Sequence, residues 1–137
     1  MDPDKMKFRL FVFDPIMFPR KLYIAIGGTK RDIEKLFNDR DDDPYQIADS
    51  EIDGSNCNVM PFVIYKKGNW KGVLVFIHTP ERMDISTIAH EADHVANAIF
   101  NACGQGVDTS DDEIHAYLVG WAAKCIDEVL RKAKKNG

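Results

Sequence analysis

Residues 90 to 94 of this chain read His90-Glu91-Ala92-Asp93-His94, and the residues around them predict a helix. Apolar residues recur there at spacings of three and four, the period of one helix face. They are Ile85, Ile88, Ala92, Val95, Ala96, Ile99 and Cys103. Asp84 is suited to be the N-cap, and Gly104 is suited to end the helix. His90 and His94 fall almost opposite this apolar stripe, so we expect them to lie outside the core.

The spacing of His90 and His94 is that of two ligands for one metal ion. Side chains at i and i+4 of a helix lie one above the other, so both imidazoles can reach the same ion. Glu91 is rotated from His90 by about 100°, which suits a carboxylate that accepts a proton from water at the metal without being a ligand. A catalytic zinc site has three protein ligands and one open position. The alternative is two exposed histidines on a solvated face.

A second helix is predicted from about Thr109 to Lys132, and it offers a third ligand. Glu113 lies near its start, with 18 residues between it and His94. The apolar stripe of this helix is formed by Ile114, Tyr117, Leu118, Trp121, Cys125 and Val129. The sequence thus places a carboxylate on a second helix, within reach of the first in a compact fold.

The motif followed by Glu113 resembles the gluzincin class of zincin-type metallopeptidases, in which H-E-x-x-H precedes a glutamate on a second helix. The sequence from Glu113 to Ala116 is similar to the E-x-x-A found around the third ligand in several such families, including small bacterial and phage-encoded domains. The resemblance covers residues 84–132. It implies a zinc metallopeptidase in which His90, His94 and Glu113 bind Zn²⁺ and Glu91 is the catalytic base for hydrolysis of a peptide or protein substrate.

Two other interpretations of this region stay open. Ser110 and Glu113 match a capping box, in which Glu113 would turn back to the backbone of its own helix; a box shifted to Thr109 would leave Glu113 available. His115 is the alternative ligand. Helical geometry sets Glu113 and His115 about 160° apart, so only one of them can face a metal.

Departures from better-known families narrow the assignment. Metzincins carry a glycine and a third histidine where this chain has Asn97 and Phe100, so that class is excluded. Thermolysin-like enzymes carry an aspartate where this chain has Tyr117. We expect Tyr117 either to bind the oxyanion that develops at the scissile carbonyl or to be a half-buried core residue. Carboxylates that orient a ligand histidine are common, and the candidates are Asp93, Asp108 and Asp112.

Composition favours one cytoplasmic domain covering residues 1–137. The chain is 45% hydrophobic with a net charge of −4, which argues against nucleic-acid binding because phosphate attraction needs concentrated positive charge. No segment is long and apolar enough to suggest a signal peptide or membrane span. The three cysteines are odd in number and lack C-x-x-C spacing, as expected in a reducing compartment. Cys57 is assigned to a polar loop without a partner.

The first 80 residues predict a small sheet and one helix. Strands are expected at residues 7–13, 22–26, 59–65 and 72–78, and a helix begins at Thr29 or Asp32. The last two strands form a hairpin with Gly68-Asn69 in its turn. Pro61 indicates that the first of these strands begins late or lies at an edge, because proline cannot donate a ladder hydrogen bond. His78 ends the hairpin and either faces the site or is an ordinary strand-terminal residue.

The element order β-β-α-β-β-α-α predicts an α+β domain, with helices on one face of a small, mostly antiparallel sheet. The sequence therefore predicts a zinc-dependent hydrolase of minimal zincin-like architecture. Two alternatives belong to other classes. One is an inactive zincin-like domain that binds metal and a partner, and the other is a metal-free interaction domain with an accidental motif.

Overall fold

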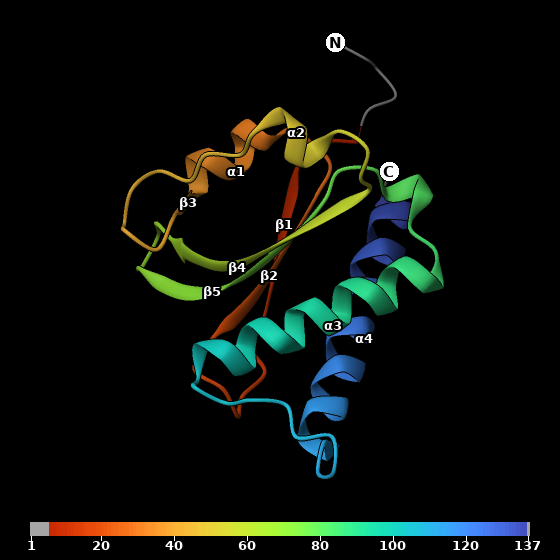
Figure 1. Cartoon of the computed structure of the whole chain (residues 1–137). Helices are drawn as coiled ribbons and strands as arrows, with labels where there is room; N and C mark the ends of the chain where they lie inside the picture. The colour runs from red at the N-terminus through yellow and green to blue at the C-terminus, as the bar shows by residue number, and fades with distance from the viewer. Residues whose placement is uncertain (1–5, 137) are drawn as a thin grey trace.

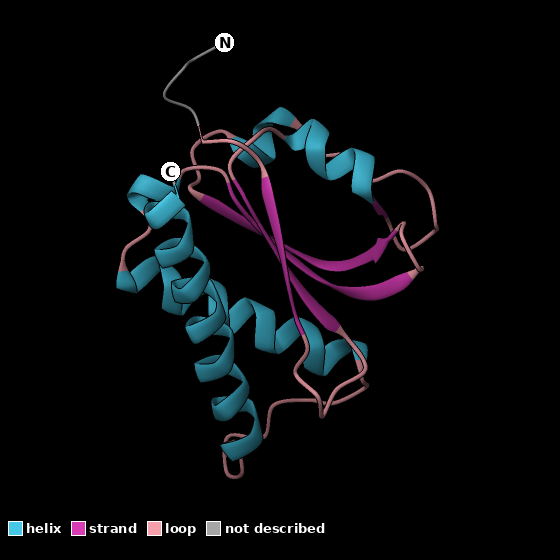
Figure 2. Cartoon of the chain, turned by 180° about the vertical axis from the view of Figure 1, so that it is seen from behind, coloured by secondary structure: helices cyan, strands magenta, loops and turns pink. Residues whose placement is uncertain are grey.

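The computed structural model describes residues 6–136, which form a five-stranded sheet with helices on both faces (Figures 1 and 2). The strands are β1 (Arg9–Phe13), β2 (Lys21–Ile26), β3 (Phe37–Asn38), β4 (Cys57–Tyr65) and β5 (Trp70–Ile77). The helices are α1 (Lys30–Leu36), α2 (Asp49–Ile52), α3 (Ile85–Ala102) and α4 (Glu113–Asn136), and a 3₁₀ turn at Pro80–Arg82 precedes α3.

The sheet is mixed, with the strand order β1-β2-β5-β4-β3. The pairs β1–β2, β5–β4 and β4–β3 are antiparallel; of these, the β5–β4 hairpin was predicted, whereas β3 was not expected as a strand. The central strands β2 and β5 are parallel, with Lys21 opposite Gly72 and Ile26 opposite Ile77. The expectation of a mostly antiparallel sheet is therefore met only in part. Turn signals predict pairing between strands that follow one another in the chain. β2 and β5 pair although α1, β3, α2 and β4 lie between them in the sequence.

The prediction of helices on one face only is wrong. α3 and α4 cover one face, where they pack on Leu22, Ile24 and Val75. α1 covers the other face, where Ile33 packs in a cluster with Tyr23 and Leu74. The physical reason is visible in β2 and β5, which are apolar at nearly every position instead of alternating. Such strands bury both faces, so both faces need cover.

α3 forms as predicted, except at its first residue. Asp84 is its N-cap, with Oδ1 accepting a hydrogen bond from the Thr87 backbone N–H at 2.8 Å. The helix ends at Ala102, just before Gly104, which adopts a positive φ of 72°. Ile85, expected in the apolar stripe, is 84% exposed. The buried stripe begins one turn later, where the helix meets the sheet.

α4 packs against α3 through most of the predicted stripe, since Leu118, Cys125 and Val129 are buried and Trp121 packs on the same cluster. Its buried residues include Leu118, Ala122, Ile126 and Val129. Ile114 and Tyr117 are mainly exposed, because the first turns of α4 extend beyond the sheet (Figure 2). Within residues 6–136, no helix combines the length and apolar character needed to cross a bilayer.

The predicted hairpin is confirmed, and it gives β4 an open edge. Gly68 and Asn69 both have positive φ in the turn. Among the described residues, β3 pairs only with Ile64 and Tyr65 of β4, so the outer edge of β4 from Cys57 to Pro61 has no strand partner. Of the two alternatives that Pro61 left, the edge position agrees with this arrangement, and the late start is wrong because β4 already begins at Cys57.

We predict that Gly72→Ala lowers the free energy of unfolding by about 1–3 kcal/mol, the usual cost of overpacking. A Cβ at this position would lie 2.4 Å from the Lys21 carbonyl oxygen of the neighbouring parallel strand. Gly120→Ala is the matched control, because a Cβ there meets nothing within 4 Å and alanine favours a helix by roughly 1 kcal/mol over glycine. Urea unfolding followed by circular dichroism measures both. Equal stability of the two variants would contradict the predicted close packing of β2 on β5.

Candidate metal centre

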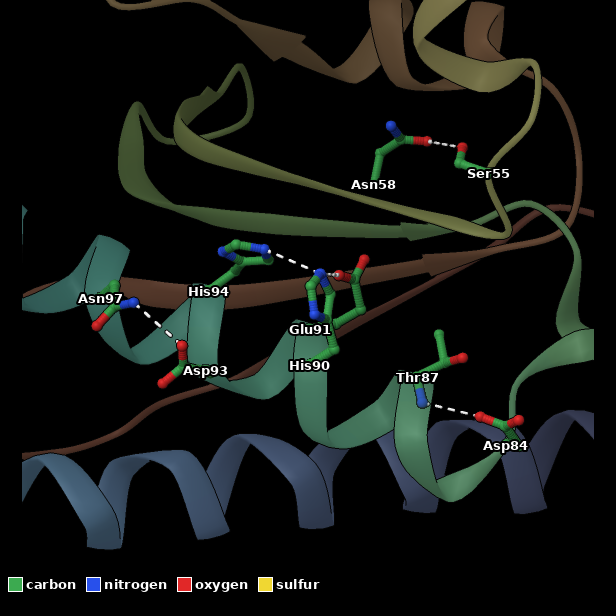
Figure 3. A network of polar contacts seen from close by, with 9 residues as sticks. All are labelled: Ser55, Asn58, Asp84, Thr87, His90, Glu91, Asp93, His94 and Asn97. Carbon is green, nitrogen blue, oxygen red and sulfur yellow. Dashed lines mark hydrogen bonds and ion pairs between the residues drawn. The ribbon is translucent and has the colours of Figure 1, made fainter.

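Three side chains of α3 converge on one point, as Figure 3 shows. The Nε2 atoms of His90 and His94 are 3.1 Å apart, and Glu91 Oε1 is 3.6 Å from His90 Nε2. All three side chains project from the side of α3 that faces β4, while α4 runs on its other side (Figure 3). Within residues 6–136, this is the group of histidine, cysteine and carboxylate side chains that can hold a metal ion.

The separation of the two imidazoles fits one zinc ion. Zinc–nitrogen bonds are about 2.0–2.1 Å long, so two nitrogens on a tetrahedral zinc lie about 3.3 Å apart. The observed 3.1 Å is close to this value. The rings meet edge to face, with centroids 4.6 Å apart, which lets both nitrogens point to a common position. Two imidazoles are donors that suit zinc, copper, iron and nickel.

The three side chains differ in solvent exposure. His90 and His94 are exposed, as predicted from their position opposite the apolar stripe. Glu91 is only 6% exposed and is the single buried polar or charged residue among those described. One residue step along the helix turns Glu91 toward the sheet. Its carboxylate therefore sits at the inner end of the site, and the imidazoles sit at the outer end.

Cys57 is the neighbour of Glu91 that the sequence did not predict. It is not a loop residue, because it begins β4 and is 8% exposed. Burial raises the pKa of the Cys57 thiol well above its ordinary range, and the charge of Glu91 and a hydrogen bond to its carboxylate raise it further. The thiol therefore stays protonated and donates to Glu91. Alternation with Val59 could have indicated a strand, but nothing in the sequence pairs Cys57 with Glu91.

A cleft of about 410 Å³ lies between β4 and α3. One wall is formed by β4 residues between Cys57 and Pro61, and the other by α3 residues between Glu91 and Asn101. The unpaired edge of β4 therefore borders the cleft that contains Glu91 and His94. Backbone N–H and C=O groups on such an edge can pair with an extended chain.

The first turn of α4 presents His115 to α3. His115 Nε2 lies 2.8 Å from Asn97 Oδ1, and its ring packs edge to face on Phe100. Glu113 is exposed and lies outside the group of three. Because the two side chains point in nearly opposite directions from the helix, the contact of His115 with α3 turns Glu113 away. The role of Glu113 as third ligand stays a prediction.

The capping box is not the reason for the position of Glu113. The Ser110 backbone N–H and hydroxyl both donate to Asp108 Oδ1, at 3.0 and 2.7 Å. The N–H that a capping box gives to Glu113 is therefore directed to Asp108.

Tyr117 is 73% exposed, so it is not a half-buried core residue. Its predicted contact with an oxyanion stays a prediction.

Two of the three carboxylates predicted to orient a ligand histidine, those of Asp93 and Asp108, have other partners. Asp93 Oδ2 accepts a hydrogen bond from Asn97 Nδ2 at 3.3 Å (Figure 3), and Asp108 is held by Ser110. Asp112 accepts the Ala116 backbone N–H through its carbonyl oxygen. His78 contacts Asn58 and Ser55, at 2.9 and 3.2 Å, and is not part of the histidine–glutamate group.

Protein-family models, curated proteins and solved structures were all compared with this chain, and none of them matches it. The function is therefore inferred from the geometry of the site.

We predict that Cys57 resists alkylation in the native protein at pH 8. The thiolate is the reactive form, and the raised pKa of Cys57 keeps the folded thiol protonated. Cys125 should behave similarly, because burial raises its pKa to about 12. Cys103 is only partly buried and should be labelled first, as mass spectrometry of digests would show. Labelling of Cys57 as fast as Cys103 would contradict the burial of the Glu91 environment.

Proposed function

We propose that this protein is a zinc-dependent hydrolase that cleaves peptide bonds. The observation that carries the proposal is the convergence of His90, Glu91 and His94 beside an open strand edge. The Nε2 atoms of the two imidazoles are 3.1 Å apart, close to the separation of two nitrogens on one zinc ion. The Glu91 carboxylate lies next to them but is buried, whereas the imidazoles are exposed. A cleft with an unpaired strand on one wall suits an extended peptide.

In this proposal, His90 and His94 hold the zinc ion. Glu113, which points away from them in this structure, would turn toward the ion to become the third protein ligand. Zinc supplies Lewis acidity, which lowers the pKa of water and polarises a carbonyl group. Glu91 accepts a proton from the attacking water and delivers it to the leaving nitrogen. The edge of β4 hydrogen-bonds to the substrate backbone and holds the scissile carbonyl near Glu91.

The burial of Glu91 supports its role as the base. A carboxylate that is removed from bulk water and placed beside a small cleft acts on a water molecule in that cleft without competition from solvent. The Cys57 thiol gives the carboxylate a fixed neighbour on its inner side, so the other side of the carboxylate is directed to the histidines.

A metal-binding domain without hydrolytic activity is the second candidate function. The exposed position of Glu113, outside the group of three, favours it. Both candidates require zinc, so metal content does not separate them. Cleavage of a diverse peptide library by the zinc-loaded protein does.

We predict that the purified protein binds about one zinc ion per chain and that His90→Ala or His94→Ala abolishes this binding. At free zinc about 100 times the Kd, binding should stabilise the fold by about 2.7 kcal/mol. Mass spectrometry of metal content and thermal unfolding with and without a chelator measure these effects. His78→Gln is the control and should keep the zinc, because His78 lies outside the group. Retention of zinc by both alanine variants would contradict the assignment.

We predict that Glu91→Gln keeps the zinc but lowers hydrolysis by about a hundredfold or more, the usual contribution of a positioned base. Glutamine has nearly the same shape and cannot accept the proton. Initial rates on a cleaved peptide, with zinc content measured on the same sample, test this. A Glu91→Gln variant that remains fully active would exclude Glu91 as the base.

We predict that Glu113→Gln weakens zinc binding by at least about tenfold, whereas His115→Phe, which keeps the ring contact with Phe100, leaves it unchanged. Loss of a carboxylate ligand removes a charged donor, which a neutral amide does not replace. Competition with a fluorescent zinc chelator gives both affinities. The reverse result would make His115 the third ligand, and no effect of either variant would exclude α4 from the metal centre.

A further inference from the structure

The cleft continues beyond the histidines toward the C-terminal end of α3. Ala98 lies four residues after His94, on the same helix face, and Asn97 and Asn101 flank it. Val59 and Pro61 of β4 form the opposite wall. Each of these five residues is uncharged, and the charged or titratable side chains that line the cleft, Cys57, Glu91 and His94, lie at its other end.

Asn97 is held in one orientation by two partners. Its Oδ1 lies 2.8 Å from His115 Nε2, and its Nδ2 donates to Asp93 Oδ2 at 3.3 Å. A flipped amide would set oxygen against the Asp93 carboxylate, so the network fixes which atom faces which partner. An amide nitrogen carries two hydrogens, and Asp93 takes one of them. The second is available to a molecule in the cleft.

The floor and rim of this part of the cleft differ in character. Ala98 is buried and lines this part of the cleft with a side chain that ends at Cβ. Asn101 is exposed at the rim and adds a second amide. A charged group placed here meets no opposite charge among the residues that line this part of the cleft. A neutral group that hydrogen-bonds to an amide would be accepted.

We propose that the cleft between Ala98, Asn97 and Asn101 of α3 and Pro61 of β4 is a substrate side-chain pocket that selects an uncharged, hydrogen-bonding residue (Asn, Gln, Ser or Thr) within two residues of the scissile bond. This inference rests on the proposed hydrolase function, and it adds the class of substrate. An extended peptide on the β4 edge sends alternate side chains toward α3. His115 and Asp93 act as positioning residues, because they hold the Asn97 amide.

The test is a cleavage profile of the zinc-loaded full chain on a peptide library with all residue types at each position. The wild type should prefer uncharged polar residues at one position near the cleaved bond. Ala98→Leu should lower cleavage of Asn and Gln peptides by about tenfold relative to Ser peptides, because it fills the floor. Asn101→Glu, at an exposed position that tolerates substitution, should raise cleavage of peptides with Lys or Arg at that position by about tenfold.

Ala89→Leu is the matched control, because Ala89 is exposed on the opposite side of the same helix. Its profile should equal that of the wild type. Zinc content is measured on every variant, and if Ala98→Leu fails to fold, Asn101→Glu decides the question. A wild type without preference at any position, or an Asn101→Glu profile equal to that of the wild type, would overturn the pocket alone. A zinc-loaded wild type that cleaves no peptide would overturn the hydrolase function and this inference with it.

Discussion

The packing of α3 on β4 and β5 is the constraint on which the candidate metal centre depends. Val95 and Ile99 are completely buried against the sheet, and each contributes about 1.5–3 kcal/mol through burial. This face fixes the rotation of the helix about its axis. A rotation by one residue step, about 100°, would bury a histidine. With the apolar face in place, Glu91 necessarily points inward, and His90 and His94 point to the cleft.

The buried carboxylate is the costly part of this arrangement. A charge removed from water lowers stability unless it has partners. Glu91 has the Cys57 thiol on one side and His90 at 3.6 Å on the other. A dication held by the two imidazoles would offset the carboxylate charge, so metal binding and stability of the fold would be coupled. A group whose burial costs stability and whose position suits catalysis is what an active site is expected to contain.

The sequence predicted the parts of this structure that depend on local chemistry. The bounds of α3, its Asp84 cap, the hairpin turn at Gly68-Asn69 and the exposure of His90 all follow from side-chain period and turn preference. The parallel pairing of β2 with β5 did not follow, because it joins distant segments. The unbroken apolar character of both strands was a signal that both faces are covered, but helices were expected on one face only. The contact between Cys57 and Glu91 and the contact between Asn97 and His115 are tertiary, and no residue pattern encodes them. The same holds for Glu113, whose direction depends on which face of α4 packs on α3.

X-ray absorption at the zinc edge, combined with anomalous diffraction from crystals of the zinc-loaded protein, tests the central claim most directly. The account predicts an anomalous peak between His90 Nε2 and His94 Nε2, with two nitrogen donors at about 2.0–2.1 Å and the Glu91 carboxylate beyond bonding distance. A zinc ion bound elsewhere, or histidine rings that diverge when zinc is present, would contradict it.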